Sequence, residues 1–193
     1  MNGAITAILL SCCILGITAG CAKLPDNSDR SFSYAYSEPE KTAISKHVAE
    51  HLEANPGESG FLLLKNGMDA FVARAVLANV AEHTIDAQYY LLHHDTIGGL
   101  FVDQLLKAAD RGVRVRLLLD DMGLEGRDFK LEIVNGHPNV EIRIFNPFGR
   151  NTGRTFQFLT GFGKQTRRSH NKSFTIDNAA TILGGRNIGN EYF

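Results

Sequence analysis

The stretch Ser169–Asn187, SHNKSFTIDNAATILGGRN, gathers a histidine, a lysine, an aspartate, paired glycines and an asparagine, and the rest of the chain is organised around it. Its first half alternates as a β-strand does. Asp177 and Asn178 favour tight turns, and a second β-rich run follows them. The stretch therefore predicts a β-hairpin with a two-residue loop, in which Ile176 pairs with Ala179.

The first strand of this hairpin carries a histidine and a lysine that are suited to phosphoryl chemistry. His170 and Lys172 are two residues apart, so on a strand they face the same way. An imidazole nitrogen can attack phosphorus while an ammonium group balances charge on the nonbridging oxygens. The expected register sets Lys172 opposite Leu183 and His170 opposite Gly185, which leaves room for a phosphate because glycine has no side chain.

The remaining polar residues of the stretch have different expected roles. Asp177 is seven residues from His170, roughly 20 Å along a strand, so we expect a turn or structural residue and not the partner that orients the imidazole. Arg186 and Asn187 follow the second strand, where they are candidate donors to phosphate oxygens.

The sequence upstream alternates between helical and strand patterns. Apolar residues recur with helical spacing in 40–54, 68–83, 96–111 and 128–136, and β-rich runs occupy 84–92, 113–119 and 140–145. The order β-α-β-α-β predicts the α/β class, with a mixed, mostly parallel sheet flanked by helices on both faces. Ligands of such sheets bind at the carboxyl ends of the strands.

Polar groups at those strand ends are candidates for further site residues: Gln88-Tyr89-Tyr90, Asp120-Asp121 and Asn146. Asp120 and Asp121 are favoured as caps, because aspartate often caps helices. The neighbouring His93, His94 and Asp95 include metal-ligand types, but neighbours on a strand point to opposite faces and no third ligand is spaced nearby. The sequence therefore predicts no metal.

A basic segment separates the scaffold from the hairpin. Residues 147–168 have no helical or strand period and no acidic residue, and Arg167 and Arg168 end the segment. One interpretation is a solvated loop. The other is a positively charged rim for an anionic substrate or a membrane surface, to which Arg186 would also belong.

The N-terminus has the pattern of an export signal. An apolar run within residues 1–20 precedes Cys21, which resembles the lipid-bearing cysteine of a bacterial lipoprotein. Residues 21–39 are polar and predict a linker, and 40–193 predict the folded domain. This organisation implies a membrane-anchored lipoprotein at the periplasmic face of the outer or inner membrane of the cell envelope.

Composition excludes some functions. The net charge is −1, so the chain is no polyanion binder by bulk charge. The cysteines, Cys12, Cys13 and Cys21, all precede the predicted domain, which therefore has no disulfide framework and no cysteine zinc site.

The combined pattern H-x-K-x4-D-x6-G-G-x-N resembles the signature of the phospholipase D superfamily; its residues here are His170, Lys172, Asp177, Gly184, Gly185 and Asn187. The strings AEHTIDAQYY, AADRGVRVRLLLDD, IFNPF and RRSHNKSFTID are similar to the N-terminal half of bacterial cardiolipin synthases. Within this resemblance, Asp177, Gly184 and Gly185 are motif residues with a structural role.

The resemblance implies a phosphatidyltransferase or phosphodiesterase that acts on membrane phospholipids through a phosphohistidine, with no cofactor. His170 and Lys172 would carry the chemistry and Asn187 would support the phosphate. A second motif, from another half of the protein or from a homodimer, would complete the site, so the chain is expected to be a first half that is incomplete at its C-terminus and inactive alone. Two alternatives stay open: a single-motif, metal-independent endonuclease homodimer, although nucleic acid is not the favoured partner, and a non-catalytic fragment that binds anionic lipid.

Overall fold

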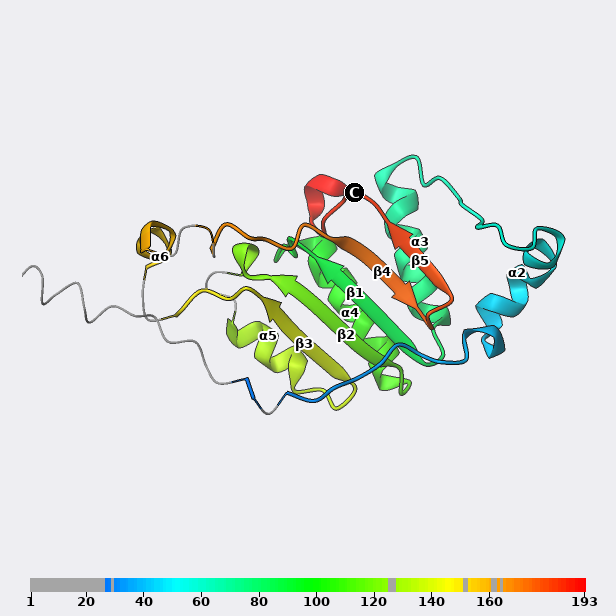
Figure 1. Ribbon diagram of the computed structural model, residues 1–193, viewed down its shortest axis with the longest axis horizontal. Coiled ribbons are helices and arrows are strands. Elements are labelled where there is room, and N and C mark those ends of the chain that lie inside the picture. Colours follow the sequence, from blue (N-terminus) through cyan, green and yellow to red (C-terminus); the bar gives the residue numbers. More distant parts are fainter. Residues whose placement is uncertain (1–26, 29, 125–127, 151–152, 161–162, 164) are drawn as a thin grey trace, which may run out of the picture. The chain divides into compact units, whose positions relative to one another are not determined.

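The computed structural model describes residues 27–28, 30–124, 128–150, 153–160, 163 and 165–193 (Figure 1). The predicted signal segment and Cys21 lie outside these residues. The chain divides into two compact units. One comprises Ser31–Asn146 with Arg168–Phe193, and the other comprises Met1–Arg30 with Pro147–Arg167. The first unit contains the hairpin and the scaffold.

A five-stranded mixed sheet forms the centre of the first unit, in the order β3-β2-β1-β4-β5. The central β1 pairs in parallel with β2, and β2 pairs in parallel with β3. On its other side β1 pairs antiparallel with β4, which forms the hairpin with β5. The strands are β1 (Thr84–Tyr89), β2 (Arg114–Asp120), β3 (Val140–Phe145), β4 (Lys172–Ile176) and β5 (Ala180–Leu183).

Helices connect the parallel strands, as the repeating pattern predicts, and the α/β class with a mixed sheet flanked by helices is confirmed. The expectation of helices on both faces is not met by the described helices, because α3, α4 and α5 pack into one core and residues 33–34 contact the other face. The helices α3, α4 and α5 lie behind the sheet in Figure 1, on one face. Asparagine or aspartate caps the two longer ones: Asn66 accepts from Asp69 N–H, and Asp95 accepts from Gly98 N–H. The helices of this unit are α2 (Ala43–Ala54), α3 (Gly67–Val80), α4 (Thr96–Asp110) and α5 (Asp128–Asn135), with short 3-10 turns η1 (Pro39–Lys41), η2 (Asp121–Gly123) and η3 (Asn190–Tyr192).

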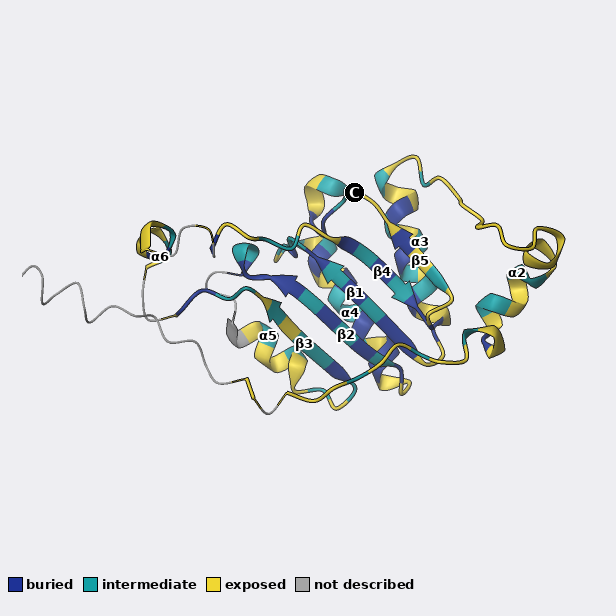
Figure 2. Ribbon diagram, viewed as in Figure 1, coloured by how far each residue is buried: buried dark blue, intermediate teal, exposed yellow. Residues whose placement is uncertain are grey.

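The core lies between the sheet and its helices. Alternate residues of β1, β2 and β4 are buried there, and the intervening residues reach the opposite face (Figure 2). Burying one such apolar side chain contributes about 1.5–3 kcal/mol. The core includes Ile85, Ala87 and Tyr89 of β1, Val115, Leu117 and Leu119 of β2, Phe174 and Ile176 of β4, and Phe101 and Leu105 of α4.

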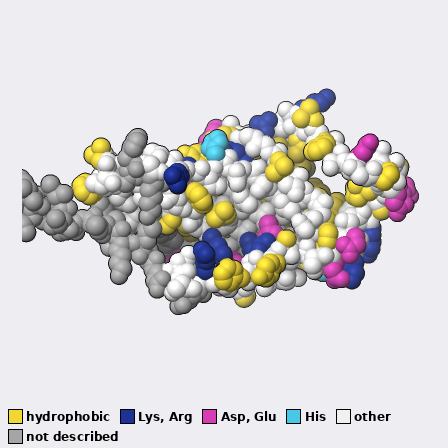
Figure 3. Space-filling model, viewed as in Figure 1, with side chains coloured by type: hydrophobic (Ala, Val, Ile, Leu, Met, Phe, Trp, Pro, Cys, Tyr) yellow, Lys and Arg dark blue, Asp and Glu magenta, His cyan; other side chains and the backbone are white. Residues whose placement is uncertain are grey.

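The opposite face of the sheet is polar, and an extended segment, residues 31–36, crosses it. This segment is part of the predicted linker 21–39. Arg114 donates to Tyr34 O, and Arg116 donates to Ser33 O and Oγ. Arg116 also forms an ion pair with Asp86. Charged side chains of both signs accordingly lie close together on this face (Figure 3). Within the described residues no helix is long and apolar enough to cross a membrane.

The hairpin forms, but its register differs from the prediction. Ile176 pairs with Ala180 and not with Ala179, so Ala179 is an extra residue in the loop. Ser173, and not Lys172, therefore lies opposite Leu183. The expected pairings of Lys172 with Leu183 and of His170 with Gly185 are wrong, because both assumed a loop one residue shorter.

The second unit contains a helix that the sequence did not indicate. Residues Arg154–Thr160 form α6, whereas the basic segment was expected to have no regular structure. Gln157 is buried, and its side-chain amide both accepts from Gly149 N–H at 2.7 Å and donates to Gly149 O at 2.8 Å. The Arg154 guanidinium lies 4.9 Å from the centre of the Phe148 ring. These local contacts stabilise regular structure in a segment whose sequence shows no helical period.

Candidate active site

His170 and Lys172 meet at the beginning of β4, next to the end of β1. The Lys172 side chain is 6% exposed, and its ammonium donates to the backbone carbonyl of His170 at 2.9 Å. The His170 side chain is exposed to solvent. Lys172 therefore holds the backbone of the histidine and leaves the imidazole accessible.

Tyr90 packs against both members of this pair. Its ring centre lies 4.8 Å from that of His170, and the Lys172 ammonium lies 5.2 Å from the Tyr90 ring. The latter contact is a cation–π interaction, which an aromatic face offers a partly desolvated cation. The sequence placed Tyr90 at a strand end that faces ligands, but only the pairing of β1 with β4 brings it to the histidine.

Burial lowers the pKa of the Lys172 ammonium below its usual value, because the charged form loses hydration. A cation held near the surface in this way is available to a phosphate oxygen. Burying the charged lysine also lowers the free energy of unfolding, which is consistent with a chemical role for this residue and not with a stabilising one.

This cost predicts a pH dependence that Lys172→Met should remove. The unfolded chain keeps the proton up to about pH 10.5, whereas the folded chain loses it at lower pH. Between these two values the unfolded state binds more protons, so wild-type stability should rise with pH relative to Lys172→Met. Urea unfolding of both proteins between about pH 7.5 and about pH 10 measures the difference. If the difference in unfolding free energy between the two proteins is the same at every pH, the predicted pH dependence is wrong.

Asn187 is buried, with 4% of its surface exposed. Its Oδ1 accepts from Leu91 N–H at 3.1 Å, and its Nδ2 donates to Tyr192 Oη at 3.0 Å. Arg186 donates to the backbone carbonyl of Tyr192 at 3.0 Å. The side-chain amide thus connects the loop after β1 with η3, a contact that spans 96 residues of sequence.

Asp177 lies at the other end of β4 from Lys172 and does not contact the imidazole. It is fully buried, and its carboxylate accepts from the backbone N–H groups of Glu82, His83 and Thr84 at 2.7–2.9 Å. Asp177 and Asn178 both have positive φ, near 51° and 52°, which these two residue types tolerate. The aspartate therefore fastens the hairpin turn to the beginning of β1.

Asp120 holds the entry to the motif. This fully buried carboxylate, at the end of β2, caps η2 through Met122 N–H and also accepts from Ser169 N–H at 2.8 Å. Arg168 donates to Asp120 at 3.1 Å and to Asn146 O at 3.0 Å. The predicted cap is present, and the carboxylate additionally fixes the residue before His170. Arg168, expected at a substrate rim, is nine-tenths buried in this ion pair.

We expect Asp120→Asn to lower the free energy of unfolding by about 1–3 kcal/mol, because a neutral amide cannot satisfy Arg168 and two N–H donors together. Urea denaturation measures the loss. Asp103→Asn is the matched control, since Asp103 forms an exposed pair with Lys107 one helical turn away. That variant should change stability by less than about 1 kcal/mol. Equal effects of the two variants would contradict a special role for Asp120.

The other predicted site residues differ in their exposure to solvent. Gly184 and Gly185 are exposed, and an added Cβ at either would meet no atom within 4 Å. Arg167 is exposed and belongs to the second unit. Asp121 is fully buried. The candidate site is therefore the pair His170 and Lys172 with Tyr90 against it, and Asn187 is bonded to Leu91, the residue after Tyr90.

The chain is similar to several known proteins. The family model described as "Cardiolipin synthase, PLD-like domain" matches residues 76–193. Cardiolipin synthase C of Escherichia coli is 50% identical over 139 residues, which make up 72% of this chain and 29% of that protein. An uncharacterized protein of Helicobacter pylori is 41% identical over 176 residues, 90% of this chain and 35% of the relative. The structure of NucT from Helicobacter pylori has a TM-score of 0.49 and 15% identity, over 68% of this chain and 75% of that one.

The chain spans about a third of the length of the curated relatives that it matches, at 29% and 35%. The matched region contains the sheet from β1 to β5, the whole H-x-K motif and η3. The chain therefore belongs to the phospholipase D superfamily, within the family of cardiolipin synthase-like PLD domains.

Proposed function

We propose that this domain transfers phosphatidyl groups between phospholipids, as a cardiolipin synthase does, through a phosphohistidine at His170. The observation that carries the proposal is the arrangement of an accessible imidazole beside a partly desolvated ammonium, His170 with Lys172. Membership in the cardiolipin synthase-like family supports the choice of phospholipid as substrate.

The proposed first step is attack by a His170 ring nitrogen on the phosphorus of a phosphodiester. The bond from phosphorus to the leaving alcohol breaks, and a general acid protonates that alcohol. Lys172 balances the charge that develops on the nonbridging oxygens. In the second step the hydroxyl of an acceptor lipid attacks the phosphohistidine and gives its proton to the group that acted as general acid. The bond from phosphorus to nitrogen breaks, and the free imidazole is regenerated.

The general acid is proposed to come from a second motif. The sequence contains H-x-K once, at His170. A second copy of this chain, or another half that bears the motif, would supply the second histidine in a symmetric arrangement. This requirement makes the rate per chain depend on chain concentration if the partner is another copy.

Membrane anchoring is proposed to bring the site to its substrate. A lipid on Cys21, which lies outside the described residues, would hold the domain at the periplasmic face of a membrane of the cell envelope. Metabolic labelling with a palmitate analogue tests this part, and a Cys21→Ser variant should lose the label.

The activity is tested with vesicles that contain phosphatidylglycerol, in the presence of a chelator. Formation of cardiolipin with release of glycerol, measured by mass spectrometry, supports the proposal. Cleavage of DNA under the same conditions with no lipid product would instead support the endonuclease alternative. Sedimentation velocity on the same samples shows whether activity accompanies dimer formation.

A further inference from the structure

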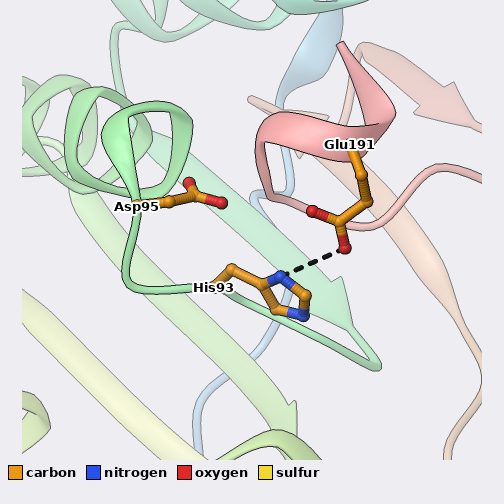
Figure 4. Close-up of side chains that lie close together, drawn as sticks. All are labelled: His93, Asp95 and Glu191. Atoms are coloured by element: carbon orange, nitrogen blue, oxygen red, sulfur yellow. Dashed lines mark ion pairs between the residues drawn. The ribbon is translucent and has the colours of Figure 1, made fainter.

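A second cluster of chemically versatile side chains lies beyond the end of β1. His93 follows β1, Asp95 is the N-cap of α4, and Glu191 belongs to η3. The three side chains point toward a common space (Figure 4). One ligand-type atom from each lies within 4.8 Å of the others. The sequence places Glu191 too far from the histidine to suggest a third ligand.

Backbone N–H groups hold the Asp95 carboxylate in place, and His93 and Glu191 contact each other. One oxygen of Asp95 accepts from Gly98 N–H at 2.9 Å, and the other accepts from Asn190 N–H at 2.7 Å. His93 Nδ1 lies 3.1 Å from Glu191 Oε1. Hydrogen bonds of this kind to a carboxylate are the outer partners that orient metal ligands in proteins.

The packing at Gly189 leaves no space for a side chain there. A Cβ at Gly189 would lie 3.0 Å from both Glu191 Oε2 and His93 Nδ1. The backbone at this glycine thus closes one side of the cluster. His93 and Glu191 nevertheless remain accessible to solvent from elsewhere, with side chains 32% and 51% exposed. The cluster is therefore closely confined by backbone and open to an ion from solution.

We propose that His93, Asp95 and Glu191 bind one divalent transition-metal ion, for which Zn²⁺ is the probe. One imidazole nitrogen and two carboxylate oxygens suit Zn²⁺, whereas Mg²⁺ and Ca²⁺ prefer oxygen ligands alone. Water completes a fourth position. A ring nitrogen that binds the ion must be free of its proton, so any proton held there is released to solvent on binding.

The proposed ion has a structural role, because it supports the contacts of Arg186 and Asn187, the candidate donors to phosphate oxygens. Glu191 is adjacent to Tyr192, whose hydroxyl accepts from Asn187 and whose carbonyl accepts from Arg186. A metal ion that joins η3 to the first turn of α4 fixes these contacts. It lies outside the chemistry of His170, so the inference is independent of the proposed phosphatidyl transfer.

The test is a Zn²⁺ titration of the full chain by calorimetry, together with thermal unfolding with and without Zn²⁺. Wild type should bind one more equivalent than Glu191→Gln or His93→Gln, or bind at least about tenfold more tightly. Zn²⁺ should also raise the Tm of wild type more than that of either variant. The three cysteines and the other histidines are common to all these proteins, so their binding cancels in the comparison.

His137→Gln is the matched control, because His137 pairs with Asp110 at 3.2 Å and no third ligand joins them in the described residues. It should bind Zn²⁺ as wild type does. Circular dichroism confirms that each variant is folded. Two substitutions on different elements keep the test decisive if one variant misfolds. Equal Zn²⁺ binding by wild type, Glu191→Gln and His93→Gln would overturn the proposal.

Discussion

His170→Gln is expected to lower the rate of phosphatidyl transfer by at least about a thousandfold, because glutamine supplies no nucleophile for the covalent step. The fold should be unaffected. The imidazole is exposed, and Lys172 binds the backbone carbonyl of His170 and not its ring. A loss of activity without a loss of stability would therefore place His170 in the chemistry.

The sharpest substrate for this measurement is an aryl phosphodiester such as bis(p-nitrophenyl) phosphate. Its nitrophenolate leaves as a stable anion and needs no protonation, so the first step does not require the second histidine. Wild type should release about one nitrophenolate per active His170 in a burst. His170→Gln should release none above the uncatalysed rate.

The control for this experiment is His51→Gln, a substitution of an exposed histidine on α2. It should retain the full burst. If His170→Gln keeps the burst with the aryl diester but loses activity on phosphatidylglycerol, His170 is the general acid and not the nucleophile. That result would contradict the proposed mechanism while leaving the family unchanged.

Asp177→Ala is expected to destabilise the protein by about 3–5 kcal/mol, the largest effect on folding that we predict. The substitution leaves three buried or half-buried N–H groups at residues 82–84 without their acceptor. It also places alanine at a φ of 51°, a left-handed conformation that aspartate tolerates better because its short polar side chain can hydrogen-bond to nearby backbone. Thermal unfolding should show a fall in Tm of about 10 °C or more.

Asp177→Asn separates the two causes. Asparagine tolerates positive φ and keeps one oxygen acceptor, so its loss should lie between those of wild type and Asp177→Ala. Asp110→Ala is the control, because it removes a carboxylate from an exposed contact with His137. Asp177→Ala variants that unfold at the wild-type Tm would show that the three N–H contacts contribute nothing measurable.

Much of the fold follows from local pattern. The apolar periodicity of α3, α4 and α5 and the β-rich runs of β1, β2 and β3 predict these elements within a few residues. The hairpin register does not follow from its turn dipeptide. The Asp177 carboxylate accepts hydrogen bonds from N–H groups at the beginning of β1, 93 to 95 residues away. The loop of the hairpin also contains one residue more than the predicted two. Local propensity carries no information about such a distant partner.

The sequence by itself predicted the class of chemistry and determined the order of elements. The spacing of His170 and Lys172 predicts phosphoryl chemistry, and alternating helices and strands indicate the parallel part of the mixed sheet. Only the tertiary structure decided what surrounds them. Antiparallel pairing of β4 with β1 brings Tyr90 to the histidine, and the return of the chain at η3 brings Glu191 beside His93. Those neighbours are remote in sequence, so only chain topology and packing bring them together.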